Sequence, residues 1–287
     1  MSTAPEAGGD VSGPSGAPAT PPATVPAKLA VEGVAKRFEG DDGAPVVALA
    51  GVDLHVAAGE FVSLVGPSGC GKSTLFDIVA GLTPPTEGRV LLDGEQPDTL
   101  LGRVGYMPQK DLLMPWRSVL DNVALGLEVG GMARRDARAR AREQMHRFGL
   151  SGFESRWPSS LSGGMRQRAA LLRTFLAGRE LMLLDEPFGA LDALTRQTMQ
   201  EWLLEVWQAD RKTILFVTHD VEEALFLSDR VYVMSARPGR VAESIAIELP
   251  RPRAAAIHGA PELVALKERL LGPLRDAARR QLDELIA

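Results

Sequence analysis

The chain has 287 residues, of which 45% are hydrophobic and 24% are charged, and its formal net charge is -5. This length allows one large domain or two small ones, and the acidic balance gives no electrostatic reason to expect nucleic acid as a partner. No run of the sequence approaches the ~20 apolar residues that a membrane helix needs. The N-terminus lacks the basic segment followed by an apolar segment that is typical of a secretory signal. The single cysteine favours a reducing cytosolic setting.

The N-terminal part of the chain divides into a tail and a β-rich region. Residues 1–28 are almost entirely Ala, Pro, Gly, Ser and Thr, so they cannot offset the entropy of ordering and we expect a disordered tail. Residues 29–56 alternate short β-rich runs with turn signals, which predicts an antiparallel β subdomain. Phe38 ends the first of these strands and is a candidate to stack on a nucleotide base, although a lone phenylalanine belongs to the core more often.

A strand–loop–helix pattern follows, and its loop carries chemistry. The apolar run 61–65 precedes Gly66-Pro-Ser-Gly-Cys-Gly-Lys-Ser73, which matches the phosphate-loop pattern. Its glycines let backbone N–H groups turn toward a phosphate, and the following helix N-terminus adds partial positive charge. Lys72 supplies a full charge to the terminal phosphates, and Ser73 supplies a hydroxyl ligand to Mg²⁺. The sequence therefore predicts a nucleoside triphosphate site formed by Gly66, Pro67, Ser68, Gly69, Cys70, Gly71, Lys72, Ser73 and Thr74.

The segment after the phosphate-loop helix changes from β-rich to helical. Short strands are expected at 89–92 and 104–107, and Gln109 follows the second strand, where its amide is a candidate ligand for Mg²⁺ or for the attacking water. The periodicity then predicts helices between 118 and 148, within an inserted α-helical subdomain of about 110–165. An arginine-rich helix in this region predicts a solvated face, and contact with acidic lipid headgroups is the alternative.

A second glycine-rich helix start occurs at Leu161-Ser-Gly-Gly-Met165. It is a second candidate anion site, because the N–H groups at a helix N-terminus favour negative charge. One phosphate loop holds one nucleotide, so Ser162, Gly163 and Gly164 are expected to contact a nucleotide on another copy of the chain. This predicts a head-to-tail dimer with two sites at its interface.

Ionisable residues follow the next two predicted strands. The apolar run 181–184 ends at Asp185, which is expected to hold Mg²⁺. Glu186 comes directly after it and is expected to orient or deprotonate the water that attacks the terminal phosphate. His219 follows the strand 213–217 and is expected to contact the same phosphate, with a structural role at the start of the next helix as the alternative.

The remaining elements complete an alternation of strands and helices. We expect a helix at 193–209 with Gln200 facing water, a capping box from Asp220 to Glu223, a hairpin around Arg237-Pro-Gly-Arg240, and a C-terminal helical extension (254–287) that is interrupted at Gly272-Pro273. The predicted fold class is α/β, of the P-loop NTPase type. It has a mostly parallel sheet with helices on both faces, an antiparallel β subdomain and an inserted α-helical subdomain.

This set of motifs resembles the ATP-binding subunit of ABC transporters. The resemblance covers about residues 29–253 and rests on the phosphate loop, Gln109, Leu161-Ser-Gly-Gly164, Leu181-Met-Leu-Leu-Asp-Glu-Pro187, Ala190-Leu-Asp192 and Thr218-His219. It implies an ATPase whose dimer closes on ATP and opens after hydrolysis, with Phe38 stacking on adenine and Asp192 in the loop that links the two sites. It also implies that Ser162, Gly163 and Gly164 bind the γ-phosphate across the dimer. Met165 departs from the glutamine or glutamate of many members, and we expect ATP binding to tolerate this change.

Finer features resemble importers of the nitrate, sulfonate and taurine type: Leu113-Met-Pro-Trp116, Phe188–Arg196, and Arg237–Arg240 followed by Leu249-Pro-Arg-Pro-Arg253. Leu171–Thr174 with Gln200–Leu203 is similar to relatives that carry pyrimidine precursors of thiamine. The resemblance implies a peripheral subunit on the cytoplasmic face of the membrane. A separate permease would be contacted around Met114-Pro-Trp116, and a substrate-binding protein would take part indirectly. The alternatives are a soluble ABC ATPase such as an iron–sulfur cluster assembly factor and, disfavoured because Ser162–Gly164 would have no purpose, a small-molecule kinase.

Overall fold

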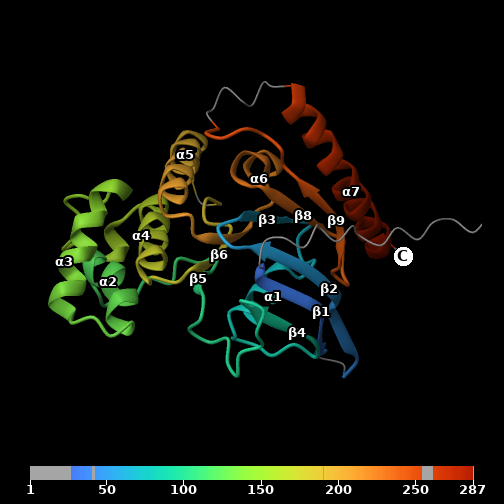
Figure 1. The fold of residues 1–287 in the computed structure, drawn as a ribbon, viewed down its shortest axis with the longest axis horizontal. Coiled ribbons are helices and arrows are strands. Elements are labelled where there is room, and N and C mark those ends of the chain that lie inside the picture. Colours follow the sequence, from blue (N-terminus) through green and yellow to red (C-terminus); the bar gives the residue numbers. More distant parts are fainter. Residues whose placement is uncertain (1–26, 41–42, 190, 254–260, 287) are drawn as a thin grey trace, which may run out of the picture.

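The computed structural model describes residues 27–40, 43–189, 191–253 and 261–286. Figure 1 shows two sheets that share a helix layer between them. The larger sheet has six strands in the order β5 (Gly105–Met107), β6 (Leu181–Asp185), β7 (Thr213–Val217), β3 (Phe61–Val65), β8 (Arg230–Met234) and β9 (Val241–Ala246). Its pairings are parallel except for the antiparallel pair of β8 and β9. The mostly parallel sheet predicted from the sequence is therefore confirmed.

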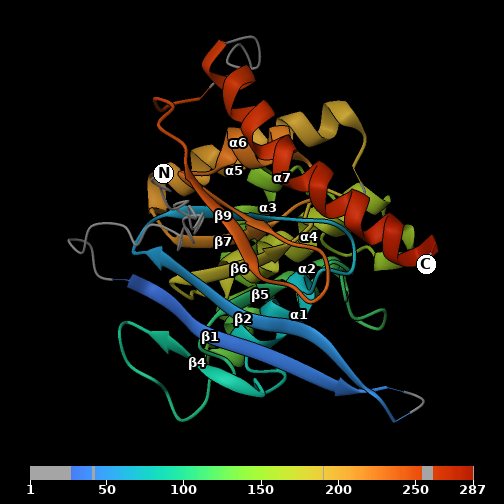
Figure 2. The ribbon, with the colours of Figure 1, turned by 90° about the vertical axis from the view of Figure 1, so that its right-hand side faces the viewer.

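The central strands of this sheet are buried on both faces. Along β6, Leu181 and Leu183 belong to one hydrophobic cluster, while Met182 and Leu184 belong to a cluster on the opposite face. This double burial explains why these strands are continuous apolar runs rather than alternating ones. Helix α1 (Lys72–Val79) packs in the first cluster. Helices α5 (Ala193–Asp210) and α6 (Val221–Leu227) contribute to the second cluster, and Figure 2 shows both helices on the opposite side of the large sheet from α1.

The smaller sheet lies against α1 and covers its outer side. Strand β1 (Ala27–Glu39) pairs antiparallel with β2 (Pro45–Ala57) and with β4 (Glu87–Leu92). Val31 and Leu54 of this sheet join the cluster that holds Phe76 of α1 and Leu64 of β3. This confirms the antiparallel β region. Of the predicted tail, residues 1–26 lie outside the described residues, whereas Ala27 and Lys28 already belong to β1.

The predicted helical insertion is present and stands beside the large sheet. It contains α2 (Val119–Val129), α3 (Arg134–Met145) and a short 3-10 turn (His146–Phe148), and α4 (Gly163–Leu176) connects it to the sheet. Figure 1 shows α2 and α3 on the far side of α4 from the strands. Four of the five α3 arginines are exposed as predicted; among them Arg134, together with the half-buried Arg138, also forms an ion pair with Asp121.

Two expectations about the C-terminal half were wrong in detail. Gln200, predicted to face water, is buried, because its amide donates to the buried carboxylate of Glu223 at 2.9 Å. The capping box is only half formed for the same reason. Asp220 accepts the backbone N–H groups of Glu222 and Glu223, but the Glu223 side chain turns to Gln200 instead of returning to Asp220.

The interruption predicted at Gly272-Pro273 is also wrong, because α7 (Pro261–Ile286) runs through both residues as one helix. Proline removes one backbone hydrogen bond from a helix interior. Packing compensates here: Leu263 and Leu270 are buried in a cluster with α6, β8 and β9, and Arg269 pairs with Glu243. The other part of the predicted extension, residues 254–260, lies outside the described residues.

We expect Gly88→Ala to destabilise the fold far more than Gly94→Ala. Both glycines have a positive φ, +80° and +82°, so an alanine pays a similar conformational cost of about 1 kcal/mol at each position. A Cβ on Gly88 would also lie 2.4 Å from the Gly33 carbonyl oxygen, whereas nothing lies within 4 Å of one on Gly94. Urea unfolding followed by tryptophan fluorescence measures both. Equal losses of stability would contradict this account of how β4 packs on β1.

Candidate functional site

The phosphate loop lies between the end of β3 and the start of α1. The Lys72 ammonium group is buried and donates to the carbonyl oxygens of Gly66 at 2.8 Å and Pro67 at 3.0 Å. Gly71 begins α1 with φ +101°, and a Cβ there would lie 2.6 Å from the Leu49 Cδ2 atom, so only glycine fits. Cys70 is fully buried and its burial raises the pKa of the thiol, which makes it a packing residue rather than a reactive one.

A second element, β6, brings an acidic group to the start of α1. The Ser73 hydroxyl donates to the Asp185 carboxylate at 3.0 Å. Burial raises the pKa of Asp185, and its hydrogen bond to Ser73 offsets this only in part. A hydroxyl beside a carboxylate is a pair of hard oxygen donors of the kind that Mg²⁺ takes. The residues present therefore fit the predicted magnesium site.

Glu186 is held between two side chains from neighbouring strand ends. One carboxylate oxygen, Oε2, accepts a hydrogen bond from the Gln109 amide at 3.1 Å and lies 3.4 Å from Nδ1 of His219. The Glu186 backbone has φ +46°, and its N–H donates to the Val217 carbonyl of β7 at 2.9 Å. These contacts point the carboxylate away from the sheet, toward the phosphate loop. The three residues predicted as catalytic are thus brought together.

These groups surround one cavity of about 540 Å³. It is lined by Ser68, Gly69, Gly71, Lys72, Ser73, Thr74, Gln109, Glu186, His219 and Arg237. Phe38, predicted to stack on a base, does not line it and is 43% exposed at the end of β1. The cavity has the charges and N–H groups of a phosphate site, and nine of its ten lining residues were predicted from the sequence.

The second glycine-rich helix start lies outside this cavity. Ser162 caps α4 by accepting the Met165 N–H at 3.2 Å, and Asp192 caps α5 by accepting the Thr195 N–H at 3.0 Å. A hydrogen bond from the Thr195 side chain, together with this backbone one, lowers the pKa of the Asp192 carboxyl group. Both caps are formed within the chain, but neither residue lines the phosphate-loop cavity. The predicted role of Ser162, Gly163 and Gly164 on another copy stays a prediction.

Comparison with known proteins decides the family. A family model described as ABC transporter matches residues 49–189. An uncharacterized ABC transporter ATP-binding protein of Methanocaldococcus jannaschii is 46% identical over 255 residues, which cover 89% of this chain and 94% of that protein. This chain belongs to the ABC transporter ATP-binding proteins. It is a transport ATPase, as its motifs predicted.

Other relatives confirm the importer branch and the fold. The taurine import ATP-binding protein TauB of Rhizobium johnstonii is 42% identical over 247 residues, covering 84% of this chain and 94% of that protein. A solved dimeric ATP-binding cassette in a post-hydrolysis state, bound to ADP and Pi, has a TM-score of 0.70 and 31% identity, over 77% of this chain and all of that one. The named relatives do not support the alternative of an iron–sulfur assembly factor.

In this ABC ATPase the chain beyond Gln109 is fastened to α4. Arg173 donates to the carbonyl oxygens of Asp111 at 2.7 Å and Leu112 at 2.8 Å, and Gln167 donates to the Gln109 carbonyl at 3.2 Å. The segment that carries the amide beside Glu186 is therefore fixed to the helix that begins at Ser162. This connection could not be predicted from the sequence, because it depends on backbone carbonyls rather than on a motif.

One residue of the cavity wall was missed. Arg237 was recognised only as part of a hairpin that resembles one importer branch, yet its side chain lines the cavity beside the phosphate loop. The signal was its position directly after β8, because β8 pairs in parallel with β3 and both strands end at the same edge of the sheet.

We expect Asp185→Asn to raise the melting temperature of the nucleotide-free protein by about 2–4 °C, the shift that about 1 kcal/mol produces at this size. The native pKa of Asp185 lies above its unfolded value, so its ionisation lowers stability as the pH rises toward neutrality. An asparagine retains an oxygen for Ser73 without the buried charge. Differential scanning fluorimetry at pH 7 tests this, with the exposed Asp98→Asn as control. A lower melting temperature than the wild type would show that burial does not dominate here.

Proposed function

We propose that this chain hydrolyses ATP to drive the import of a small solute through a separate membrane permease. One observation carries the proposal. The ends of β3, β5, β6 and β7 place a phosphate loop, the Ser73–Asp185 pair and the Gln109–Glu186–His219 cluster around a single cavity. This arrangement supports binding of a nucleoside triphosphate and attack by water on its terminal phosphate.

Each residue has a role that follows from its contacts. The N–H groups of the loop Gly66–Thr74 and the Lys72 charge bind the phosphates, and Ser73, Asp185 and Gln109 hold Mg²⁺, which neutralises developing charge when bound. Glu186 accepts a proton from water, because its carboxylate is aimed into the cavity by Gln109 and His219. Phe38 is the candidate to stack on adenine, being an exposed ring outside the phosphate cavity.

The working form in this proposal is a head-to-tail dimer of two copies. The start of α4 offers backbone N–H groups at Gly163 and Gly164 and a capping hydroxyl at Ser162, but these residues do not line the nucleotide cavity of their own chain. Gly164 lies so close to Leu191 that a Cβ would be 2.8 Å from its Cδ2 atom, which packs the loop of Asp192 against this helix start. A second copy would complete each site, as the dimeric form of the solved relative supports.

We expect Glu186→Gln to bind ATP normally but to hydrolyse it at least about 100-fold more slowly, since a general base contributes 10²–10⁴-fold. The glutamine keeps an oxygen for the Gln109 amide and loses the proton acceptor. Trapped ATP should then favour the dimer, which light scattering with and without ATP measures. Glu205→Gln, an exposed carboxylate on α5, is the control. Wild-type turnover in the Glu186 variant would remove this residue from the mechanism.

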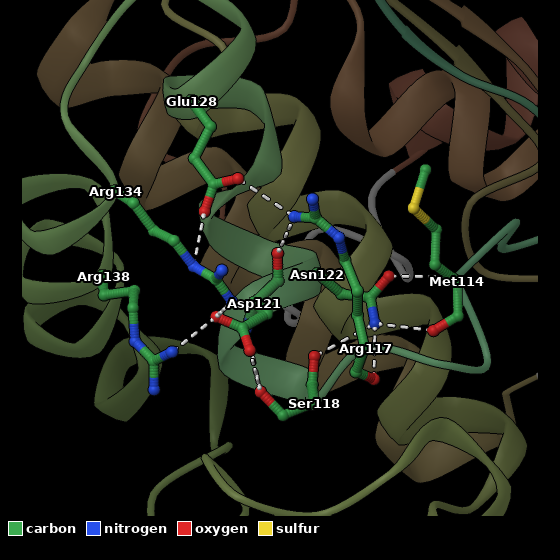
Figure 3. Close-up of polar contacts among 8 residues, drawn as sticks. All are labelled: Met114, Arg117, Ser118, Asp121, Asn122, Glu128, Arg134 and Arg138. Carbon is green, nitrogen blue, oxygen red and sulfur yellow. Dashed lines mark hydrogen bonds and ion pairs between the residues drawn. The ribbon is translucent and has the colours of Figure 1, made fainter.

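The surface proposed for the permease is the segment between Gln109 and α2. Trp116 is 72% exposed and Leu112 59% exposed, yet the backbone between Met114 and Ser118 is firmly held. Asn122 is fully buried; its oxygen accepts the Met114 N–H at 2.7 Å, and its amide donates to the Met114 and Ser118 carbonyls. Figure 3 shows this amide among the backbone groups of the segment.

A network of ion pairs also stabilises the segment between Met114 and Ser118 and the start of α2. Arg117 donates to Glu128 at 3.0 Å, and Asp121 pairs with Arg138 at 2.9 Å while Arg134 reaches both acids (Figure 3). A rigid loop that exposes an indole fits a protein contact, because exposed tryptophan is frequent among the residues that dominate binding. This loop follows Gln109 closely in the chain, so a displacement of Gln109 at the nucleotide cavity would be passed to it along the backbone.

Within the described residues no helix is long and apolar enough to cross a membrane. From the similarity to import ATP-binding proteins, we assign the chain a peripheral place on the cytoplasmic face of the membrane and assign transport to a permease and its substrate-binding protein. The similarity to taurine import ATPases supports a nitrate-, sulfonate- or taurine-like anion as the solute. A ligand screen on the substrate-binding protein identifies it, and a thiamine pyrimidine precursor in that screen would move the chain to the neighbouring importer type.

We expect Trp116→Ala to abolish co-purification with the permease from detergent-solubilised membranes and to leave the ATPase rate of the isolated chain within about twofold. The reason is that Trp116 contacts solvent rather than the cavity, so its loss removes a binding anchor worth about 2 kcal/mol or more. Val129→Ala, 77% exposed at the end of α2, is the control. Unchanged permease recovery with the tryptophan variant would place the interface elsewhere.

A further inference from the structure

The cavity holds one cation that the proposed catalytic roles leave unused, Arg237. Arg237 lies in the hairpin between β8 and β9 and lines the same cavity as Ser68, Gly69 and His219. The register explains this position: Val233 of β8 pairs with Val65 of β3, so the hairpin and the phosphate loop leave the sheet side by side.

The hairpin backbone is fixed to the phosphate loop and to β2. The Gly239 N–H donates to the Ala48 carbonyl at 3.0 Å, and the Gly239 carbonyl accepts the Ala50 N–H at 3.0 Å. A Cβ on Gly239 would lie 2.0 Å from the Cys70 carbonyl oxygen, so the tip packs directly on the loop. Ser235 closes the hairpin, donating its N–H to the Arg240 carbonyl at 2.9 Å. The backbone that carries Arg237 is therefore held in place by its contacts with β2 and the phosphate loop.

The Arg237 guanidinium is exposed and forms no hydrogen bond or ion pair with any other described residue. This holds even toward Asp276 of α7, which lines a second cavity together with Arg237. Lys72, the other cation of the wall, already donates to two carbonyls of its own loop. A triphosphate that enters the cavity thus meets Lys72, which is hydrogen-bonded to its own loop, and Arg237, whose guanidinium is free to bind phosphate oxygens.

We infer that Arg237 is a second phosphate-binding cation, which contacts the phosphate chain of the nucleotide held by its own phosphate loop. Arginine suits this role because its planar guanidinium binds two phosphate oxygens at once. The inference rests on the proposed function, since it takes the cavity to be the nucleotide site. It adds to that site a residue that lies outside the phosphate loop and the other nucleotide-binding motifs.

The test compares nucleotide affinity in variants of the full chain by calorimetry, with ATP and with ADP, in the presence of Mg²⁺. Arg237→Ala should weaken ATP binding about tenfold, and Arg237→Lys should recover part of it, because charge is kept while the two-point contact is lost. The loss of ATP affinity in Arg237→Ala should become smaller as the salt concentration is raised from about 50 to about 500 mM, because ionic screening weakens contacts between charged groups. A structural role for the side chain would show neither the lysine recovery nor the salt dependence.

Two controls separate the possible failures. Arg240→Ala changes the same hairpin at a residue that does not line the phosphate cavity, and we expect its affinity to stay within twofold of the wild type. Lys72→Ala should lose ATP binding. If Lys72→Ala binds ATP normally, the proposed site itself is wrong. If it fails to bind while Arg237→Ala binds like the wild type, only the role of Arg237 is overturned.

The measurement is made at protein concentrations where light scattering shows monomers. A loss that appears only under dimeric conditions would mean that Arg237 acts on the other copy, and this would overturn the assignment to its own nucleotide. A loss of ATP affinity in the monomer supports the contact. If ADP affinity falls as well, Arg237 contacts the α- or β-phosphate; if ADP affinity is unchanged, it contacts the γ-phosphate.

Discussion

The parallel register of β6, β7 and β3 is the constraint on which the site depends. Asp185 pairs with Val217, and Val217 pairs with Leu64, so the three strands end within one residue of each other. Parallel strands have all their carboxyl ends at one edge, and each strand here is followed at once by a functional group. A shift of one residue would turn every buried side chain to the wrong face, so burial on both faces holds the chemistry in place.

The same edge concentrates groups that lower stability. The Asp185 carboxyl group is buried, and Glu186 has a backbone conformation that non-glycine residues seldom adopt. Each is unfavourable in the free protein and becomes favourable when phosphate and a cation arrive. The large apolar clusters on both faces of the sheet supply the stability that permits this arrangement.

What the sequence could predict follows from the range of each interaction. The phosphate loop, Asp185 and Glu186 are local patterns on an apolar strand, so their place at one edge could be inferred from periodicity alone. Gln200 could not be placed, because its burial depends on Glu223, which lies on another helix. Pro273 was misjudged for a related reason: local propensity marks an interruption, and packing of α7 against α6 and the sheet overrides it. The position of Arg237 beside the phosphate loop follows only from the order of the strands, which the sequence does not show.

The arrangement around α4 gives a physical reason why nucleotide binding can move the helical region. Arg173 and Gln167 fasten the backbone of residues 109–112 to α4, and the Gln109 amide contacts Glu186 at the cavity. A phosphate that drew Gln109 inward would therefore pull on α4, which Ser162 caps, and on the loop that exposes Trp116. One displacement thus reaches the surface proposed for a second copy and the surface proposed for the permease. This coupling between the cavity and α4 needs no flexible segment, since side chains of α4 donate hydrogen bonds directly to the main-chain carbonyls of residues 109–112.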